Sequence, residues 1–148
     1  LELAAPLHLV IADSGHATST AEVVEDVHRH WTAQPDVYER WFDEIGECAI
    51  QARLAMKTGN VAEIGAWMTR NHELLQKLNV SSDLLDTLVR AALKADALGA
   101  KLSGSGRGGN MIALVANEAA ASAMAEILAS AGAVRTLITK VPATLKPS

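Results

Sequence analysis

The hydrophobic pattern of the chain changes its period at Gly99, and this change limits the folds that the chain can adopt. Before Gly99, apolar residues recur every three or four positions through four long segments, as they do in amphipathic helices. After Gly99, the short apolar runs at residues 100–103 and 111–115 have the length and composition of strands. An earlier apolar run at residues 7–12 also predicts a strand. The chain must therefore combine several helices with a sheet built from distant segments.

Four helices are predicted between the first strand and Gly99. Ser19 with Glu22, and Asn60 with Glu63, stand three residues apart, so each pair can form a capping box at the start of a helix. Gly99 is expected to end the fourth helix, because glycine tolerates the left-handed conformation of a helix cap. The expected ranges are residues 20–31, 35–58, 61–78 and 82–98.

The remaining pattern completes an α+β fold. Asn117 is expected to cap a helix at residues 118–130, and residues 134–141 supply a last strand. The resulting order is strand, four helices, strand, strand, helix, strand, which lacks the alternation of a doubly wound α/β domain. We therefore predict a mainly antiparallel four-stranded sheet with helices packed on one face. The length of 148 residues fits one domain, spanning residues 1–148.

Composition argues against several classes of partner. Thirteen basic and seventeen acidic residues give a net charge of −4, which disfavours a nucleic-acid partner. The single cysteine, Cys48, cannot form an internal disulfide, and no Cys/His cluster has zinc-ligand spacing, so no metal site is predicted. No apolar run reaches the roughly 18 residues of a membrane span. These features predict a cytoplasmic protein without a membrane partner.

The densest cluster of glycines lies between the strands at residues 100–103 and 111–115. Four glycines among residues 104–109 allow backbone amides to converge on an anion such as phosphate, and Arg107 could add guanidinium donors. The letters match G-x-G-x-x-G, but a dinucleotide-binding loop must start a helix, and Asn110 starts a strand instead. The alternative is that these glycines only build a tight, bulged connection between strands.

Three other residues are weaker candidates for ligand contact. Asp13 and Ser14 follow the first strand, where polar residues often face ligands, although an ordinary strand-to-helix turn explains them equally well. Asn71 could face a neighbouring loop. His72 falls on an apolar helical stripe, so we expect a buried, hydrogen-bonded histidine rather than a general base. The residues present form no recognisable catalytic constellation.

Three segments of the sequence together show a family resemblance. Residues 101–109, with the sequence KLSGSGRGG, and the strand after them resemble the third conserved motif of the GHMP kinase superfamily, K-x-T-G-A-G-G-G-G. Residues 12–15 followed by Ser19 and Thr20 resemble a stretch of the mevalonate kinases within that superfamily. So do residues 71–75 with residues 78–81. The resemblance extends from about residue 7 to residue 141.

This resemblance implies a ferredoxin-like C-terminal domain that lies beside an N-terminal domain, with an active site between them. It implies ATP-dependent phosphorylation of the mevalonate hydroxyl in isoprenoid biosynthesis, with ATP and Mg bound mainly by the N-terminal domain. The catalytic Asp and Lys of the family belong to that domain, so the chain alone is expected to be inactive. The expected substrate or phosphate contacts are Ser103, Gly104, Ser105, Gly106, Arg107, Gly108 and Gly109, with Asp13, Ser14 and Asn71 on the substrate side.

The motif also departs from the family pattern. Ser105 replaces an alanine, Arg107 replaces a glycine, and Asn110 stands where mevalonate kinases often have cysteine. An arginine within the loop adds positive charge that could meet a more acidic substrate. Two alternatives therefore stay open: another GHMP kinase acting on phosphomevalonate, homoserine or a sugar, or a non-catalytic binding or dimerisation module. Under each of these interpretations, including the mevalonate kinase, the protein could be a homodimer.

Overall fold

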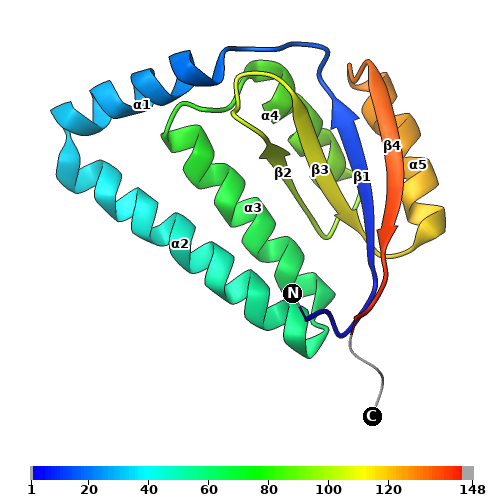
Figure 1. Cartoon of the computed structure of the whole chain (residues 1–148). Coiled ribbons are helices and arrows are strands. Elements are labelled where there is room, and N and C mark those ends of the chain that lie inside the picture. Colours follow the sequence, from blue (N-terminus) through cyan, green and yellow to red (C-terminus); the bar gives the residue numbers. More distant parts are fainter. Residues whose placement is uncertain (1, 145–148) are drawn as a thin grey trace.

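One antiparallel sheet organises the chain (Figure 1), and the computed structural model describes residues 2–144 of it. The strand order is β2-β3-β1-β4, and each pair of neighbours is antiparallel. The first and last strands of the chain are therefore adjacent, and β2 and β4 form the two edges. The strands are β1 (Leu7–Asp13), β2 (Gly99–Ser103), β3 (Asn110–Val115) and β4 (Arg135–Val141). This arrangement confirms the predicted α+β class and antiparallel sheet.

The helices form two groups around this sheet. Two of them, α4 and α5, cover one face, as Figure 1 shows behind the strands. The long hairpin of α2 and α3 packs along the edge strand β2, and its lower end in Figure 1 also contacts the opposite face of the sheet. Helix α1 lies at the upper end of this hairpin in the same view. The helices are α1 (Thr20–Ala33), α2 (Pro35–Thr58), α3 (Val61–Lys77), α4 (Asp83–Lys94) and α5 (Glu118–Ser130). No helix within residues 2–144 is long and apolar enough to cross a membrane.

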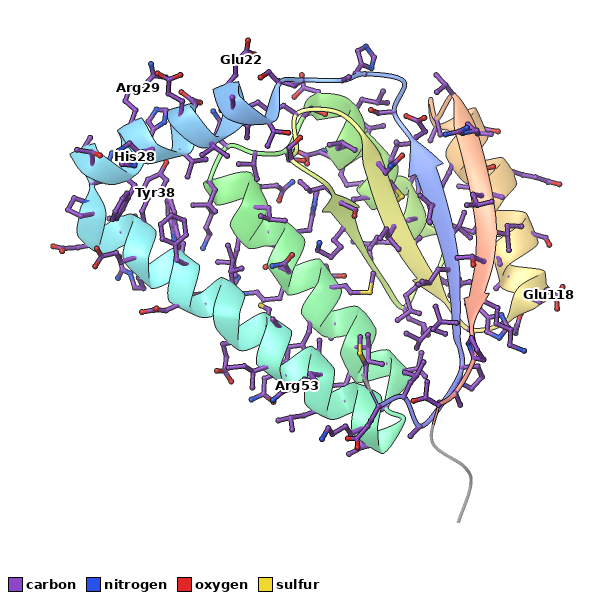
Figure 2. The ribbon with its side chains drawn as sticks, viewed as in Figure 1. Glu22, His28, Arg29, Tyr38, Arg53 and Glu118 are labelled. Carbon is purple, nitrogen blue, oxygen red and sulfur yellow. The ribbon has the colours of Figure 1, made fainter. Side chains whose placement is uncertain are left out.

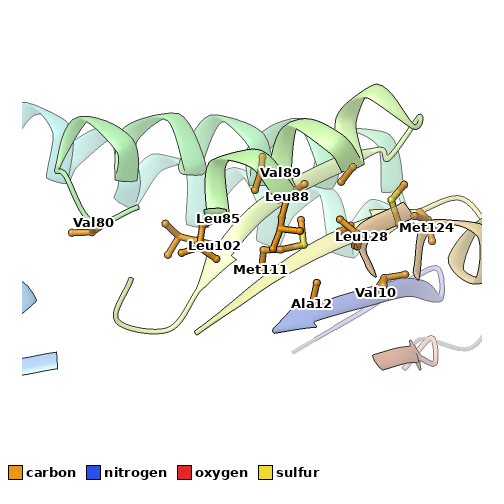
Figure 3. Close-up of a cluster of buried hydrophobic side chains, with 14 of the residues drawn as sticks. Val10, Ala12, Val80, Leu85, Leu88, Val89, Leu102, Met111, Met124 and Leu128 are labelled. Carbon is orange, nitrogen blue, oxygen red and sulfur yellow. The ribbon is translucent and has the colours of Figure 1, made fainter. Parts of the chain in front are cut away.

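Alternate residues of the strands build the main core. Val10 and Ala12 of β1 and Met111 of β3 point towards α4 and α5, where they meet Leu85 and Leu128 (Figure 3). All five side chains are almost completely buried. Successive residues of a strand point to opposite faces, so the residues between them belong to the other face of the sheet. A smaller apolar cluster there joins Leu7 and Leu114 to Ala55 and Ile64 of the helical hairpin.

The backbones of α3 and β2 touch at a pair of glycines. A Cβ atom on Gly99 would lie 1.9 Å from the carbonyl oxygen of Gly65, and one on Gly65 would lie 2.1 Å from the carbonyl oxygen of Leu98. Neither position has room for a side chain, because real Cβ contacts are much longer. Gly99 therefore serves close packing at the start of β2.

This packing corrects the predicted end of the fourth helix. Gly99 is not its cap: α4 ends at Lys94, and Asp96 takes a left-handed conformation with φ of 62°. The amide of Leu98 then donates to the carbonyl of Leu114 at 2.8 Å, which starts the approach to β3. The apolar stripe continues beyond the helix because Ala97 and Leu98, both partly buried, pack against the two core clusters, not because they are helical.

The predicted helix starts are all confirmed to within one residue. The side chains of Asn60, Ser82 and Asn117 each accept a hydrogen bond from the backbone amide three residues later. The side-chain Nδ2 of Asn60 also donates to Glu63 Oε2 at 3.0 Å. The capping box at Ser19 is wrong: Ser19 makes no side-chain cap, and Glu22 points away from the helix into solvent (Figure 2). The segment before α1 is instead held by contacts made further back, at Thr18.

The two ends of the described chain are joined by a pair of hydrogen bonds. The amide of Leu3 donates to Thr144 Oγ1 at 2.8 Å, and the amide of Thr144 donates to the carbonyl oxygen of Leu3 at 2.8 Å. These bonds lie beyond the paired strands β1 and β4, at the lower end of the sheet in Figure 1. They hold the segments before β1 and after β4 together beyond the end of the paired strands.

Candidate functional site

The candidate site lies where β1 ends and where β2 turns into β3. Strand register places Ser103 opposite Asn110, Asn110 opposite Asp13, and Asp13 opposite Arg135. Directly opposed residues of antiparallel strands point to the same face and lie about 5 Å apart. These four polar residues therefore form one row across the sheet, on the face that α4 and α5 leave open. We call them the polar row.

A cavity of about 360 Å³ lies over the β1–β4 half of the polar row. Within it, Arg135 Nη2 is 3.5 Å from Asp13 Oδ2, and Asp13 Oδ1 accepts a hydrogen bond from the Gly15 amide at 2.9 Å. Asp13 is thus oriented by its own turn while it still faces the cavity. The cavity is lined by Ile11, Asp13, Asn110, Arg135, Thr136 and Leu137.

The glycine-rich loop, residues 104–109, closes the end of the sheet next to the polar row. Two of its amides are occupied, because Arg107 donates to the carbonyl oxygen of Val80 at 2.8 Å and Gly109 donates to that of His16 at 2.7 Å. The amides at positions 104, 105, 106 and 108 have no acceptor within residues 2–144. Gly104 and Ser105 are also exposed. The loop therefore offers free amide donors of the kind that bind anions.

Close backbone contacts fix this loop from two sides. A Cβ atom on Gly106 would lie 1.9 Å from the carbonyl oxygen of Val80, and one on Gly108 would lie 2.7 Å from that of His16. Thr18 Oγ1 adds a hydrogen bond to the carbonyl oxygen of Arg107 at 2.8 Å. The glycines thus connect two strands, as the alternative interpretation held, and they also hold the loop in one position against both neighbouring segments.

Arg107 fastens the loop to α1. Its Nε donates to the carbonyl oxygen of Asn79 at 2.9 Å, and its Nη2 pairs with Asp26. The hydrogen bond from Arg107 holds the pKa of the Asp26 carboxyl below its usual range. Asp26 stands 81 residues before Arg107, and nothing in the sequence pattern signals the pair. This geometry supports a structural role for Arg107, and its contact with a phosphate stays a prediction.

Ser14, directly after β1, also supports the glycine-rich loop. It is only 1% exposed, its amide donates to the carbonyl oxygen of Gly109 at 2.8 Å, and its Oγ accepts from the His16 amide at 3.3 Å. Of the two residues proposed at the end of β1, Asp13 therefore faces the cavity and Ser14 holds the turn. Substrate contact at Ser14 stays a prediction that the burial of its side chain does not favour.

His72 links three elements next to the loop. Its Nδ1 accepts a hydrogen bond from the amide of Leu102 in β2 at 3.3 Å, so Nε2 carries the proton and donates to Asp86 Oδ1 at 3.1 Å. Ser81 Oγ donates to the same oxygen at 2.5 Å. Burial lowers the pKa of His72, which favours this neutral form. The prediction of a buried, hydrogen-bonded histidine is confirmed.

Asn71 does not join the polar row. It lines a second cavity between α2, α3 and β2, together with Lys101, which precedes Ser103 by two residues on the same face of β2. Within residues 2–144, no group of three or more histidine, cysteine or acidic side chains could hold a metal ion. The described residues thus provide amide donors and a polar row at this end of the sheet.

Three comparisons relate this geometry to known proteins. The sequence family described as GHMP kinases, C terminal, matches residues 49–134, which is more than half of the chain. A mevalonate kinase of Thermococcus onnurineus (strain NA1) is 38% identical over 113 residues, covering 73% of this chain and 34% of the relative. A mevalonate kinase of Thermococcus gammatolerans (strain DSM 15229 / JCM 11827 / EJ3) is 33% identical over 139 residues, covering 90% of this chain and 42% of the relative.

A solved structure extends the likeness to almost the whole fold. The crystal structure of L. major mevalonate kinase in complex with R-mevalonate superposes with a TM-score of 0.93 at 33% sequence identity, and it covers 98% of this chain and 45% of that protein. The chain thus spans about a third to under a half of the length of these relatives.

Proposed function

The chain belongs to the GHMP kinases, as a C-terminal domain of that family, and we propose that it serves an ATP-dependent kinase that phosphorylates the hydroxyl group of mevalonate. The relatives reported above carry the name mevalonate kinase, and one was crystallised with R-mevalonate. The chain would form the C-terminal part of the enzyme, with ATP bound mainly by an N-terminal domain. It would act in the cytoplasm.

The free amides of the glycine-rich loop are the observation that carries this proposal. Phosphoryl transfer requires little covalent chemistry from the protein, and it depends on positioning and on neutralising charge across the phosphate oxygens. Gly104 and Ser105, which follow Ser103 of the polar row in the chain, have unpaired backbone amides, while Arg107 and Thr18 hold the loop in place. Such a loop would bind phosphoryl oxygens without reorganising during the reaction.

The polar row would contact the substrate. Asp13 and Arg135 face one cavity with Asn110, so this cavity offers a carboxylate, a guanidinium group and an amide to a small hydroxy acid. ATP would supply the phosphoryl group. Mg would be bound, with ATP, mainly by the N-terminal domain.

The pairing of Arg107 bears on the choice of substrate. An arginine in the loop had suggested a more acidic substrate such as phosphomevalonate, but its guanidinium group is occupied by Asp26 and by the carbonyl oxygen of Asn79. Arg107 therefore has less to offer to an additional phosphate group. This arrangement favours mevalonate over phosphomevalonate.

The test is substrate profiling of the longer protein that contains residues 1–148. We expect ATP-dependent turnover with mevalonate, and none with phosphomevalonate, homoserine or galactose. Turnover with one of those three compounds and not with mevalonate would refute the substrate assignment. No turnover with any of them, in a protein that binds ATP, would support the non-catalytic module instead. The 148-residue chain alone is the negative control and should show no turnover.

A further inference from the structure

The second cavity, between α2, α3 and β2, has the composition of a small-molecule site. It encloses about 240 Å³ and is lined mainly by apolar side chains, with Asn71 and Lys101 as its polar members. Small-molecule pockets typically combine apolar walls with a few polar groups that set orientation. The volume is below that of a drug-sized pocket, so any ligand must be short. The other lining residues are Ile45, Cys48, Ala49, Ala52, Trp67 and Met68.

The Lys101 ammonium group at this cavity has no acidic partner. Its Nζ donates to the carbonyl oxygen of Leu102 at 2.8 Å, and no carboxylate of residues 2–144 forms an ion pair with it. Burial lowers the pKa of Lys101. A half-buried charge without a counter-ion is unfavourable, and proteins usually pair such groups. Two of its three donors are still available to an anion in the cavity.

Asn71 supplies the second unsatisfied polar group. Its side-chain amide makes no hydrogen bond within the described part of the chain, although it is half-buried on α3 and lines the same cavity as Lys101. One ammonium group and one amide suit a carboxylate, which carries a single charge and two acceptor oxygens. A doubly charged phosphate would require more cationic groups than this cavity offers.

We propose that the cavity lined by Asn71 and Lys101 binds a short aliphatic monocarboxylate, with its carboxylate at these two residues and its hydrocarbon part between α2 and α3. The apolar wall of Ile45, Trp67 and Met68 receives the hydrocarbon part. The site lies on the helical-hairpin side of β2 and uses none of the glycine-rich loop. It therefore stands independently of the proposed kinase reaction.

The first experiment titrates the 148-residue chain with hexanoate, 1-hexanol and hexylamine. Binding is followed by nuclear magnetic resonance at the Asn71 side-chain amide and the Trp67 indole, both of which line the cavity. We expect saturable shifts with hexanoate, binding at least about tenfold weaker for hexanol because the charge-assisted hydrogen bonds are lost, and none for the amine. Equal binding of hexanol and hexanoate, or no saturable shift with hexanoate, would overturn the proposal.

Three variants test the contribution of the Lys101 charge, the contribution of the cavity volume, and the effect of removing a lysine elsewhere. Lys101→Met removes the charge at similar length and should weaken hexanoate at least about tenfold while it leaves hexanol unchanged. Lys94→Met, at an exposed position near the end of α4, is the matched control and should bind hexanoate as the parent does. Ala49→Phe fills the cavity from its exposed rim and should abolish binding of both probes. Unchanged hexanoate binding in a folded Lys101→Met variant would contradict the proposal.

A final measurement tests the other possible occupant. A carboxylate side chain from elsewhere in a longer protein could also neutralise Lys101. Hexanoate binding that persists in the longer protein supports a ligand site. Binding seen only in the 148-residue chain would show that the longer protein fills the cavity itself, and it would refute a ligand site there. Neither result depends on kinase activity, so failure here is distinct from failure of the proposed function.

Discussion

The two faces of the sheet are built from alternate residues of the same strands, yet they differ in how completely they are covered. Towards α4 and α5, Val10 and Met111 are fully buried in a continuous core. On the open face, Ile11 and Ile112 are half-buried, Leu137 is 58% exposed, and the polar row lies at the loop end. One face therefore stabilises the fold, while the other keeps space and polar groups for a ligand.

The largest predicted effect contrasts a residue from each face. Met111→Ala should lower the free energy of unfolding by about 2–5 kcal/mol, because it leaves a cavity in the covered core. Leu137→Ala, on the open face, is the comparison and should cost less than about 1 kcal/mol. Urea unfolding of both variants provides the measurement. Similar losses for the two would mean that the open face contributes to stability as much as the covered face does.

The next prediction concerns the fixed position of the glycine-rich loop. Gly106→Ala should lower kcat/KM of the longer protein about a hundredfold, because its Cβ would collide with the Val80 carbonyl and displace the loop. Gly104→Ala is the matched control, since Gly104 also has a positive φ but a Cβ there meets nothing within 4 Å. We expect a clearly smaller loss for it. Equal losses would show that backbone strain, and not the Val80 contact, explains the requirement for glycine.

The third prediction concerns how the free energy of unfolding depends on pH, through the buried His72 beside β2. Burial lowers the pKa of His72 in the folded state, whereas an unfolded histidine gains its proton below about pH 6.5. The unfolded chain then binds more protons than the folded chain, so the free energy of unfolding should fall as the pH drops below about 6.5. His72→Gln should flatten this part of the profile, measured by urea unfolding between pH 7.5 and 5.

Exposed His28 supplies the control for that experiment, because it lies on α1 away from the His72 network. His28→Gln should leave the acid-dependent slope in place. An unchanged slope in His72→Gln would mean that other groups cause the loss of stability in acid.

The smallest expected change in stability concerns the ion pair at the loop. Arg107→Met removes the contacts to Asp26 and Asn79, and partly exposed pairs of this kind contribute little to stability. Hydrogen exchange at the amides of residues 107 and 109 should nevertheless become faster, because the loop loses its connection to α1. Arg29→Met also removes a partner of Asp26, but it leaves the loop untouched and should not change this exchange. Equal exchange in both variants would contradict the role of Arg107 as a fastener.

Local signals in the sequence predicted most of the elements. Asn60 and Asn117 cap their helices through contacts three residues away, so the pattern that predicts them is contained in the sequence itself. The antiparallel sheet followed from the order of the elements. The class of the glycine-rich loop was also predictable, because Asn110 begins β3 and excludes the strand–helix geometry of a dinucleotide site.

Long-range contacts account for what the sequence did not reveal. The end of α4 is set by the approach of Gly99 to Gly65, which requires the chain to leave the helix early. The partner of Arg107 is Asp26, and no periodicity relates two positions that are 81 residues apart. Asn71 was expected to face a neighbouring loop, whereas the fold places it in a cavity with Lys101; its contact with a substrate stays a prediction.

The hydrogen bonds between Leu3 and Thr144 have a practical consequence for engineering. Domains whose ends lie together tolerate circular permutation, because a short peptide can join the old ends while new ones are opened elsewhere. A linker between these two residues and a cut in the turn after α5 would turn β1 and β4 into a covalent hairpin. Such a permuted gene would begin with the edge strand and would still place Asp13 beside Arg135.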